Sequence, residues 1–201
     1  MTPWITGWTQ PGLTIRNVLA TNPRQGFWQL IGISALSIAF SASYSHSLGS
    51  KETPWILFLL LFGLTFCSCI LNVYFMGWVL KTTGRFLGGS GSSLAFRAVT
   101  LWSSLPNLLF ALMWVMLIML KPHSAFILNA NHNTTVLINL IGLTLFCWQF
   151  YLLTCMVREV QGFGLVKTLI NLVIAYLFVF ITVLIVLLSI GSVYFLIFHQ
   201  K

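Results

Sequence analysis

A glycine-rich run with one serine, together with four histidines, is the first place to look for chemistry in this sequence. Gly88-Gly89-Ser90-Gly91 matches the GxSG pattern of intramembrane serine proteases, whose serine needs a histidine to accept its proton. The run lacks the Gly-Lys-Ser/Thr ending of a phosphate-binding loop. No HxH or HxxxH spacing brings two histidines together and no CxxC pair occurs, so the spacing predicts no metal site. The histidines are His46, His123, His132 and His199.

Side-chain amides within long apolar segments are the second group with a potential function. A polar group inside a membrane is costly unless it has a partner, so these amides are expected to bind one another or a ligand. Two interpretations are open. The amides form hydrogen bonds between helices, or they line a polar pocket that opens to the cytoplasm and holds a small molecule or a lipid headgroup. The predicted pocket residues are Asn72, Asn107, Gln149 and Asn171.

Glu159 is one of only two acidic residues in the chain, and it follows a long apolar segment. We expect it at the membrane rim, paired with a basic residue near the same membrane face. A rim ion pair contributes about 0–1 kcal/mol in water, so its expected role is to fix the turn that carries it. The predicted cytoplasmic rim consists of Glu159 and its expected partners, Arg85, Arg97, Arg158 and Lys167.

The composition assigns the chain to the integral membrane proteins. Its 201 residues are 58% hydrophobic and 6% charged, whereas a soluble domain carries about 25% charged residues. The net charge is +8, but the basic residues stand singly between apolar runs. We therefore interpret them as topology signals and as contacts with anionic lipids at the cytoplasmic face, and expect no nucleic-acid partner.

Five apolar segments are long enough for membrane-spanning helices, which need about 20 residues each. Short alternating strands typical of a barrel are absent, so the sequence predicts an all-α bundle of five transmembrane helices. Residues 1–26 form a short amphipathic segment that we expect on the membrane surface, and residues 27–201 form the membrane domain. Pro106 should kink the third helix. The spans are predicted near 27–44, 54–80, 101–120, 135–157 and 168–198.

The distribution of lysine and arginine predicts the orientation. Basic residues are more frequent in 1–26 and in the second and fourth connections than on the other side, which places the N-terminus in the cytoplasm. On this topology every histidine lies on the face opposite Ser90, so the serine has no base. We therefore predict no catalytic residue, no cofactor and no metal, and expect a protein that is not an enzyme.

Small residues recur every fourth position in the first span, at Ala35, Ala39 and Ser43. Such a stripe lets helix backbones approach closely. It serves either packing within the chain or a homo-oligomer face. Trp114 and Trp148 fall in the middle of their spans and are expected to pack between helices.

Several motifs, taken in order, resemble the Yip family of Ypt/Rab-interacting membrane proteins. The similarity extends over residues 11–175, with five spans in the family's arrangement. It is closest in kind to the compact bacterial members. The motifs are PGLTIR (Pro11–Arg16) with Asn22-Pro23, LGGSGSS (Leu87–Ser93), LWSSLP (Leu101–Pro106), and VREVQG (Val157–Gly162) followed by Lys167-Thr168-Leu169.

The resemblance implies a non-enzymatic multi-pass membrane protein in membrane organisation or trafficking-like interaction. Eukaryotic members have a long polar N-terminus and DLYGP and GY-type signatures, none of which is found here. A bacterial inner (plasma) membrane is therefore expected rather than Golgi or ER, and a Rab-type GTPase is a doubtful partner. The alternative from the residues themselves is a small-molecule or lipid transporter or channel that uses the polar pocket.

Overall fold

The computed structural model describes residues 3–51, 54–121, 125–128 and 132–198. Within these ranges the chain forms helices and turns, without strands. In chain order the elements are α1 (Pro3–Thr9), α2 (Pro11–Thr21), α3 (Phe27–Ser45), the short 3-10 helix η1 (Leu48–Ser50), α4 (Pro54–Phe86), α5 (Ser93–Trp102), α6 (Pro106–Leu120), α7 (His132–Gln161) and α8 (Leu165–Phe198).

Five helical stretches are long and apolar enough to cross a membrane, which confirms the prediction of an all-α multi-pass membrane protein. Helix α4 continues past Leu80 to Phe86, and α7 continues past Val157 to Gln161. Both extensions lie beyond the apolar residues from which the spans were predicted. The five stretches are Phe27–Ser45, Pro54–Phe86, Ser93–Leu120, His132–Gln161 and Leu165–Ser189.

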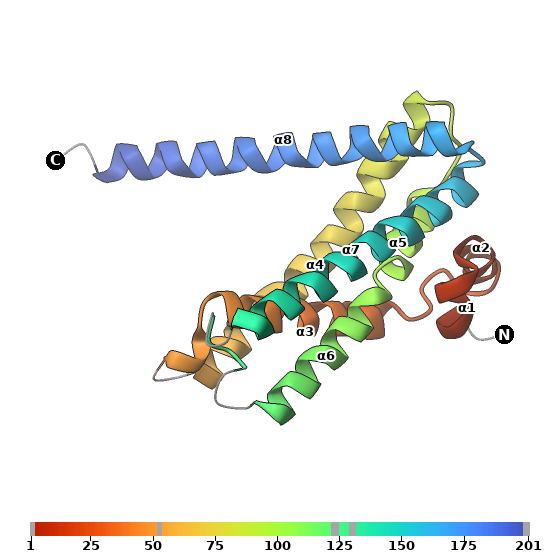
Figure 1. The fold of residues 1–201 in the computed structure, drawn as a ribbon. Helices are drawn as coiled ribbons and strands as arrows, with labels where there is room; N and C mark the ends of the chain where they lie inside the picture. The colour runs from red at the N-terminus through yellow and green to blue at the C-terminus, as the bar shows by residue number, and fades with distance from the viewer. Residues whose placement is uncertain (1–2, 52–53, 122–124, 129–131, 199–201) are drawn as a thin grey trace.

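The first part of α8 packs on α4 and α7, and the rest of this helix runs away from the other helices (Figure 1). Thr168, Leu172 and Ala175 are fully buried, whereas the side chains of residues 183–189 are all exposed. The exposed part is almost wholly apolar. It is a surface suited to hydrocarbon rather than water.

The connections between helices gather at two ends of the molecule. We call the end that holds α1, α2, the α4–α5 turn and the α7–α8 turn the N-terminal face; it lies on the right in Figure 1. At the other end, η1 meets the chain that follows α6. There the Gly49 N–H donates to the Phe126 carbonyl at 3.1 Å, and the Leu128 N–H donates to Ser47 Oγ at 3.1 Å.

Pro106 begins α6 after a three-residue turn that separates it from α5. Proline has no N–H, so it cannot donate to the Trp102 carbonyl four residues earlier. That carbonyl instead lies 3.4 Å from the Leu105 N–H, which forms a tighter turn of 3-10 type. The position at which we predicted a kink is therefore a break between two helices of one span.

The amphipathic N-terminal segment docks on the protein through its apolar stripe, while its place at the membrane surface stays a prediction. The buried stripe of α2 contains Thr14, Ile15 and Val18, all with zero exposure, and it packs against α7 and α5. Leu13 remains exposed on the other side. The apolar stripe was expected to face lipid, but Ile15 and Val18 face helices instead.

The small-residue stripe of α3 is used inside the chain. Ala35 and Ala39 are fully buried and Ser43 is almost so, where α3 packs on α4 and α6. Trp114 is also fully buried, as expected for a residue between helices. Trp148 is not: its side chain is largely exposed and lies edge-on to Trp8 of α1, with ring centroids 6.4 Å apart.

Candidate functional site

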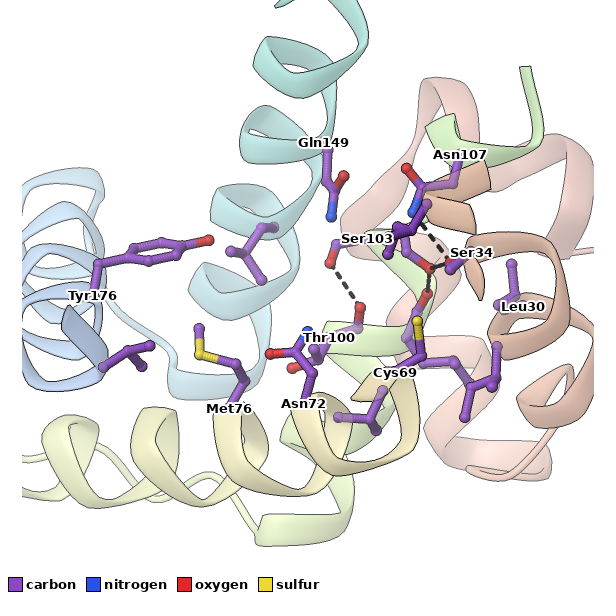
Figure 2. Close-up of a pocket in the computed structure, with 17 residues that line it drawn as sticks. Leu30, Ser34, Cys69, Asn72, Met76, Thr100, Ser103, Asn107, Gln149 and Tyr176 are labelled. Atoms are coloured by element: carbon purple, nitrogen blue, oxygen red, sulfur yellow. Dashed lines mark hydrogen bonds between the residues drawn. The ribbon is translucent and has the colours of Figure 1, made fainter. Parts of the chain in front are cut away.

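A cavity of about 340 Å³ lies where α3, α4, α7 and α8 meet the break between α5 and α6. Three of the four predicted pocket residues line it, namely Asn72 of α4, Asn107 of α6 and Gln149 of α7 (Figure 2). Hydroxyl groups of Thr100 and Tyr176 add to its polar wall. Its lining combines these polar groups with apolar side chains and contains no charged residue, so the cavity is neutral.

One wall of this cavity is held by hydrogen bonds. Asn107 Nδ2 donates to Ser34 Oγ at 3.1 Å, and Ser34 Oγ donates to Ser104 Oγ at 3.2 Å. Ser104 also donates to the Leu101 carbonyl at 2.7 Å, and Ser103 to the Thr100 carbonyl at 3.0 Å. The Asn107 amide is thus anchored by Ser34 of α3, and Ser104, in the break before Pro106, accepts a hydrogen bond from the Ser34 hydroxyl in turn.

The opposite wall leaves amides available. Asn72 and Gln149 point into the cavity in Figure 2, and neither side chain forms a hydrogen bond with any described residue. Each amide offers two N–H donors and one carbonyl acceptor. A guest molecule with hydroxyl or amide groups would therefore find unused partners on this side.

Asn171 does not join the cavity. Its side chain is fully buried between α8 and α4, where the Thr83 hydroxyl donates to Asn171 Oδ1 at 2.6 Å. Tyr176 is the α8 residue that lines the cavity instead. The two positions are five residues apart, which turns them by about 140° around the helix axis. Asn171 was assigned to the pocket because of its depth along the helix, but depth does not determine toward which neighbour a side chain points.

Glu159 pairs with Arg16 of α2, which corrects the four partners expected for it. Arg16 Nε donates to Glu159 Oε1 at 2.8 Å, and Arg16 Nη2 contacts the same oxygen. Gly12 lies against the Glu159 side chain, and a Cβ there would be in ordinary contact with it, 3.4 Å from Oε2. We call the Arg16–Glu159 pair the latch, because it joins the N-terminal helices to the end of α7.

The remaining rim residues separate into two environments. Arg85, Arg158 and Lys167 are exposed on the N-terminal face. Arg97 is half-buried, with its guanidinium carbon 4.3 Å from the centroid of the Tyr74 ring. The sequence placed all four residues at one rim, but in the described part of the structure only the Arg97 side chain packs against another residue of the chain, Tyr74.

Gln161 is a residue that sequence reasoning missed. Its side chain is buried in the α4–α5 turn, where the Gly91 N–H donates to Gln161 Oε1 at 3.4 Å and Gln161 Nε2 lies 3.5 Å from the Leu80 carbonyl. A Cβ on Gly84 or Gly89 would overlap the Gln161 amide. We call these two glycines the glycine cradle. The glycine-rich run thus admits a side chain from α7.

The protease and metal patterns have no support in the described residues. Ser90 lies exposed in the α4–α5 turn of the N-terminal face, whereas His46 and His132 lie at the other end. His123 and His199 fall outside the described residues. No group of three His, Cys, Asp or Glu side chains suited to a metal ion occurs among the described residues.

Comparison with protein families matches residues 6–188 to the Yip1 domain. The chain belongs to the Yip1 domain family. The similarity drawn from the motifs is thereby confirmed, and the match takes in both the cavity and the latch. Comparisons with curated proteins and with solved structures gave no match.

The Yip1 domain family is not known as an enzyme family. The motifs that indicated it are brought together in this Yip1 domain. VREVQG supplies Glu159 to the latch and Gln161 to the glycine cradle, while PGLTIR supplies Arg16. LWSSLP supplies Ser104, which accepts a hydrogen bond from Ser34, the partner of Asn107. The signature residues thus have packing and positioning roles around the N-terminal face and the cavity.

Loss of the latch should loosen the N-terminal helices of the Yip1 domain. An exposed ion pair contributes about 0.2–1 kcal/mol, so Glu159→Gln is expected to speed backbone hydrogen exchange in α2 by a factor of about 1.4 to 5. Hydrogen–deuterium exchange of the full chain in detergent measures this. Arg158→Gln, an exposed neighbour outside the latch, is the control and should change nothing.

The charge-swapped variant Arg16→Glu/Glu159→Arg distinguishes the effect of the ion pair from the effect of replacing either residue alone. Exchange protection in α2 should return toward that of the parent, because opposite charges meet again. Unchanged exchange in Glu159→Gln would show that α2 is held by its apolar stripe alone.

Proposed function

We propose that this Yip1-domain protein is a non-enzymatic organiser of the membrane, with its N-terminal face toward the cytoplasm. The observation that supports this most directly is the exposed positive charge of that face, on Arg85, Arg158 and Lys167. Basic residues favour the cytoplasmic side and attract anionic lipids. A bacterial inner membrane rich in such lipids is the setting we propose.

The positive charge of this face can attract anionic groups because few acidic side chains neutralise it. Within the described residues, the latch is the sole ion pair, and it occupies Arg16 alone. Each basic residue near an anionic surface contributes about 1 kcal/mol of attraction. Several residues around one membrane protein would thus enrich anionic lipid beside it, and would equally suit an acidic protein partner.

Lipid enrichment can be measured by excising the protein from vesicles with its surrounding lipid in polymer-bounded discs. Vesicles of phosphatidylcholine and phosphatidylglycerol should give discs with a higher phosphatidylglycerol share than the vesicles. The variant Arg85→Gln/Arg158→Gln/Lys167→Gln should lower that share toward the bulk value. Lys51→Gln/Lys121→Gln, on the other side of the molecule, is the control. Equal shares in the parent and the triple variant would refute this function.

The cavity favours a second candidate function, passage or binding of a small polar molecule. The observation behind it is the pair of unused amides, Asn72 and Gln149, in a neutral wall. A neutral cavity disfavours an isolated ion, because burial of an unpaired charge is costly. The class of guest that fits is a neutral solute with several hydroxyl or amide groups, or the uncharged part of a lipid headgroup.

Proteoliposomes test the cavity with glycerol as the probe. If the cavity conducts it, protein-containing vesicles should take up glycerol faster than empty ones in light-scattering measurements. Asn72→Leu/Gln149→Leu should lower the protein-dependent rate roughly tenfold, since two hydrogen bonds are lost. Asn139→Leu, an exposed amide of α7 outside this cavity, should leave the rate unchanged. Equal uptake by empty vesicles would exclude glycerol conduction.

A further inference from the structure

A second hollow, of about 290 Å³, lies at the N-terminal face between the start of α3, α4 and α5. Two arginines line it, Arg24 from the connection before α3 and Arg97 from α5. The aromatic rings of Trp28 and Tyr74 form other parts of the wall. This hollow shares only Leu101 with the amide-lined cavity, so the two sites are distinct.

Arg97 is fixed in this hollow by its neighbours. Its guanidinium lies over the Tyr74 ring, which restricts the orientation of the planar group. Its backbone is pressed against α4 at Gly77, where an added Cβ would lie 3.1 Å from the Arg97 nitrogen. The arginine is thus presented as a rigid fork rather than as a flexible surface charge.

Arg97 also has an unmet hydrogen-bonding requirement. Its Nε is buried and has no hydrogen-bond partner among the described residues. A buried charged donor is normally satisfied by an acceptor, so an unpaired one marks a place where an acceptor is missing. No carboxylate lines the hollow: Glu159 belongs to the latch, and Glu52 lies outside the described residues.

Arg24 supplies a second cation from a turn of defined shape. Asn22 Oδ1 accepts a hydrogen bond from the Arg24 N–H at 3.0 Å, which closes the turn before α3. The Arg24 side chain is exposed, at the open side of the hollow. One half-buried and one exposed arginine thus lie next to aromatic and aliphatic side chains, so a cationic region borders an apolar one.

We propose that this hollow binds the phosphate group of an anionic membrane lipid, with Arg97 and Arg24 as its ligands. Phosphate oxygens match the planar donor fork of arginine, and a small shift of the Arg97 side chain on binding would let one of them reach the covered, unpaired Nε. Trp28 and Phe27, at the start of α3, lie beside the glycerol and acyl region of the lipid. The proposal rests on the proposed function, because it assigns one defined site within the lipid-enriching face.

Native mass spectrometry of the full chain, with phosphatidylglycerol added stepwise in detergent, tests the site. The parent protein should retain one lipid at low lipid concentration. Arg97→Gln and Arg24→Gln should each raise the apparent Kd for the lipid roughly tenfold, the effect of losing one charge-assisted hydrogen bond. Arg97→Lys should also weaken it, because an ammonium lacks the planar fork. Arg85→Gln, on the same face outside the hollow, is the matched control.

Two results would overturn the proposal. If Arg24→Gln and Arg97→Gln retained the lipid as the parent does, neither arginine would be a ligand. If Arg85→Gln lost the lipid equally, the effect would come from the overall positive charge of the face and not from this hollow. Arg24 is exposed, so its variant remains decisive if Arg97→Gln disturbs the contact with Gly77. The variant Arg85→Gln/Arg158→Gln/Lys167→Gln, in which lipid enrichment in discs is reduced, should still retain this single lipid.

Inorganic phosphate separates a lipid site from a site for a free anion. Millimolar inorganic phosphate should leave the retained phosphatidylglycerol in place, because the free ion has no glycerol or acyl region to contact Trp28 and Phe27. Displacement of the lipid would assign the hollow to a free phosphate and overturn its assignment to a membrane lipid.

Discussion

Replacing Trp102 with alanine should lower the free energy of unfolding in detergent by about 3–5 kcal/mol, the largest effect that we expect from a single substitution. Trp102 is fully buried at the end of α5, next to the break before Pro106. Its ring lies 5.3 Å from that of Trp4, edge to face, and an added Cβ on Gly26 would lie only 3.2 Å from it.

The loss comes from packing. Helix α1 and the turn before α3 pack on this indole, so its removal leaves a cavity that rigid helices cannot close. Transfer of the ring into detergent recovers apolar surroundings but not close contacts. Thermal or denaturant unfolding, followed by circular dichroism, measures the change.

Trp55 offers the matched control, because its side chain is 75% exposed at the start of α4. Trp55→Ala should change the unfolding free energy by less than about 0.5 kcal/mol. If the Trp102 and Trp55 variants were equally stable, the packing of the N-terminal helices around Trp102 would be refuted.

Replacing Gly84 with alanine is expected to cost about 1–3 kcal/mol, because the new methyl group would occupy the place of the Gln161 amide. The amide would have to leave its buried position in the glycine cradle and give up its contacts with Gly91 and Leu80. Gly63, an α4 residue with open space around it, provides the control: Gly63→Ala should be neutral or slightly stabilising.

A double-mutant cycle identifies the cause. In a Gln161→Ala background no amide remains to be displaced, so Gly84→Ala should cost little there, and the coupling should exceed about 1 kcal/mol. If both backgrounds respond equally to Gly84→Ala, the glycine cradle does not act through Gln161. Denaturant unfolding of the four proteins gives all terms of the cycle.

The latch and the glycine cradle are formed at the same end of α7. Glu159 faces α2 and Gln161 faces the α4–α5 turn, two residues apart on one helical turn. A change at this point would therefore reach the N-terminal helices and the turn that carries Ser90 together. At the surface of the N-terminal face, polar contacts join α7 to α2 and to the α4–α5 turn. The apolar side chains that pack these segments together lie beneath those contacts.

Composition and hydrophobic length were enough to predict the five spans and the all-α class. Both depend only on local properties, since a helix that crosses hydrocarbon must be apolar and satisfy its backbone groups internally. Pro106 likewise marked the place where the third span is interrupted, because the missing N–H is a property of the residue itself. The motifs, in order, were enough to indicate the family.

Pairings between distant segments could not be predicted in this way. Four basic residues, all nearer to Glu159 in sequence, were expected as its partners at the rim. Glu159 instead pairs with Arg16, 143 residues away. Only the docking of α2 on α7 brings these charges together. The sequence shows that α2 has an apolar stripe but not whether lipid or protein covers it, because both surroundings are apolar.

The assignment of polar residues shows the same division. Sequence position placed Asn72, Asn107, Gln149 and Asn171 at similar depth, and depth follows from distance along a helix. The direction in which each amide points depends on how the helix is rotated by its neighbours. Helix packing alone brought three amides into one cavity, buried Asn171 against Thr83 and placed Gln161 among the glycines.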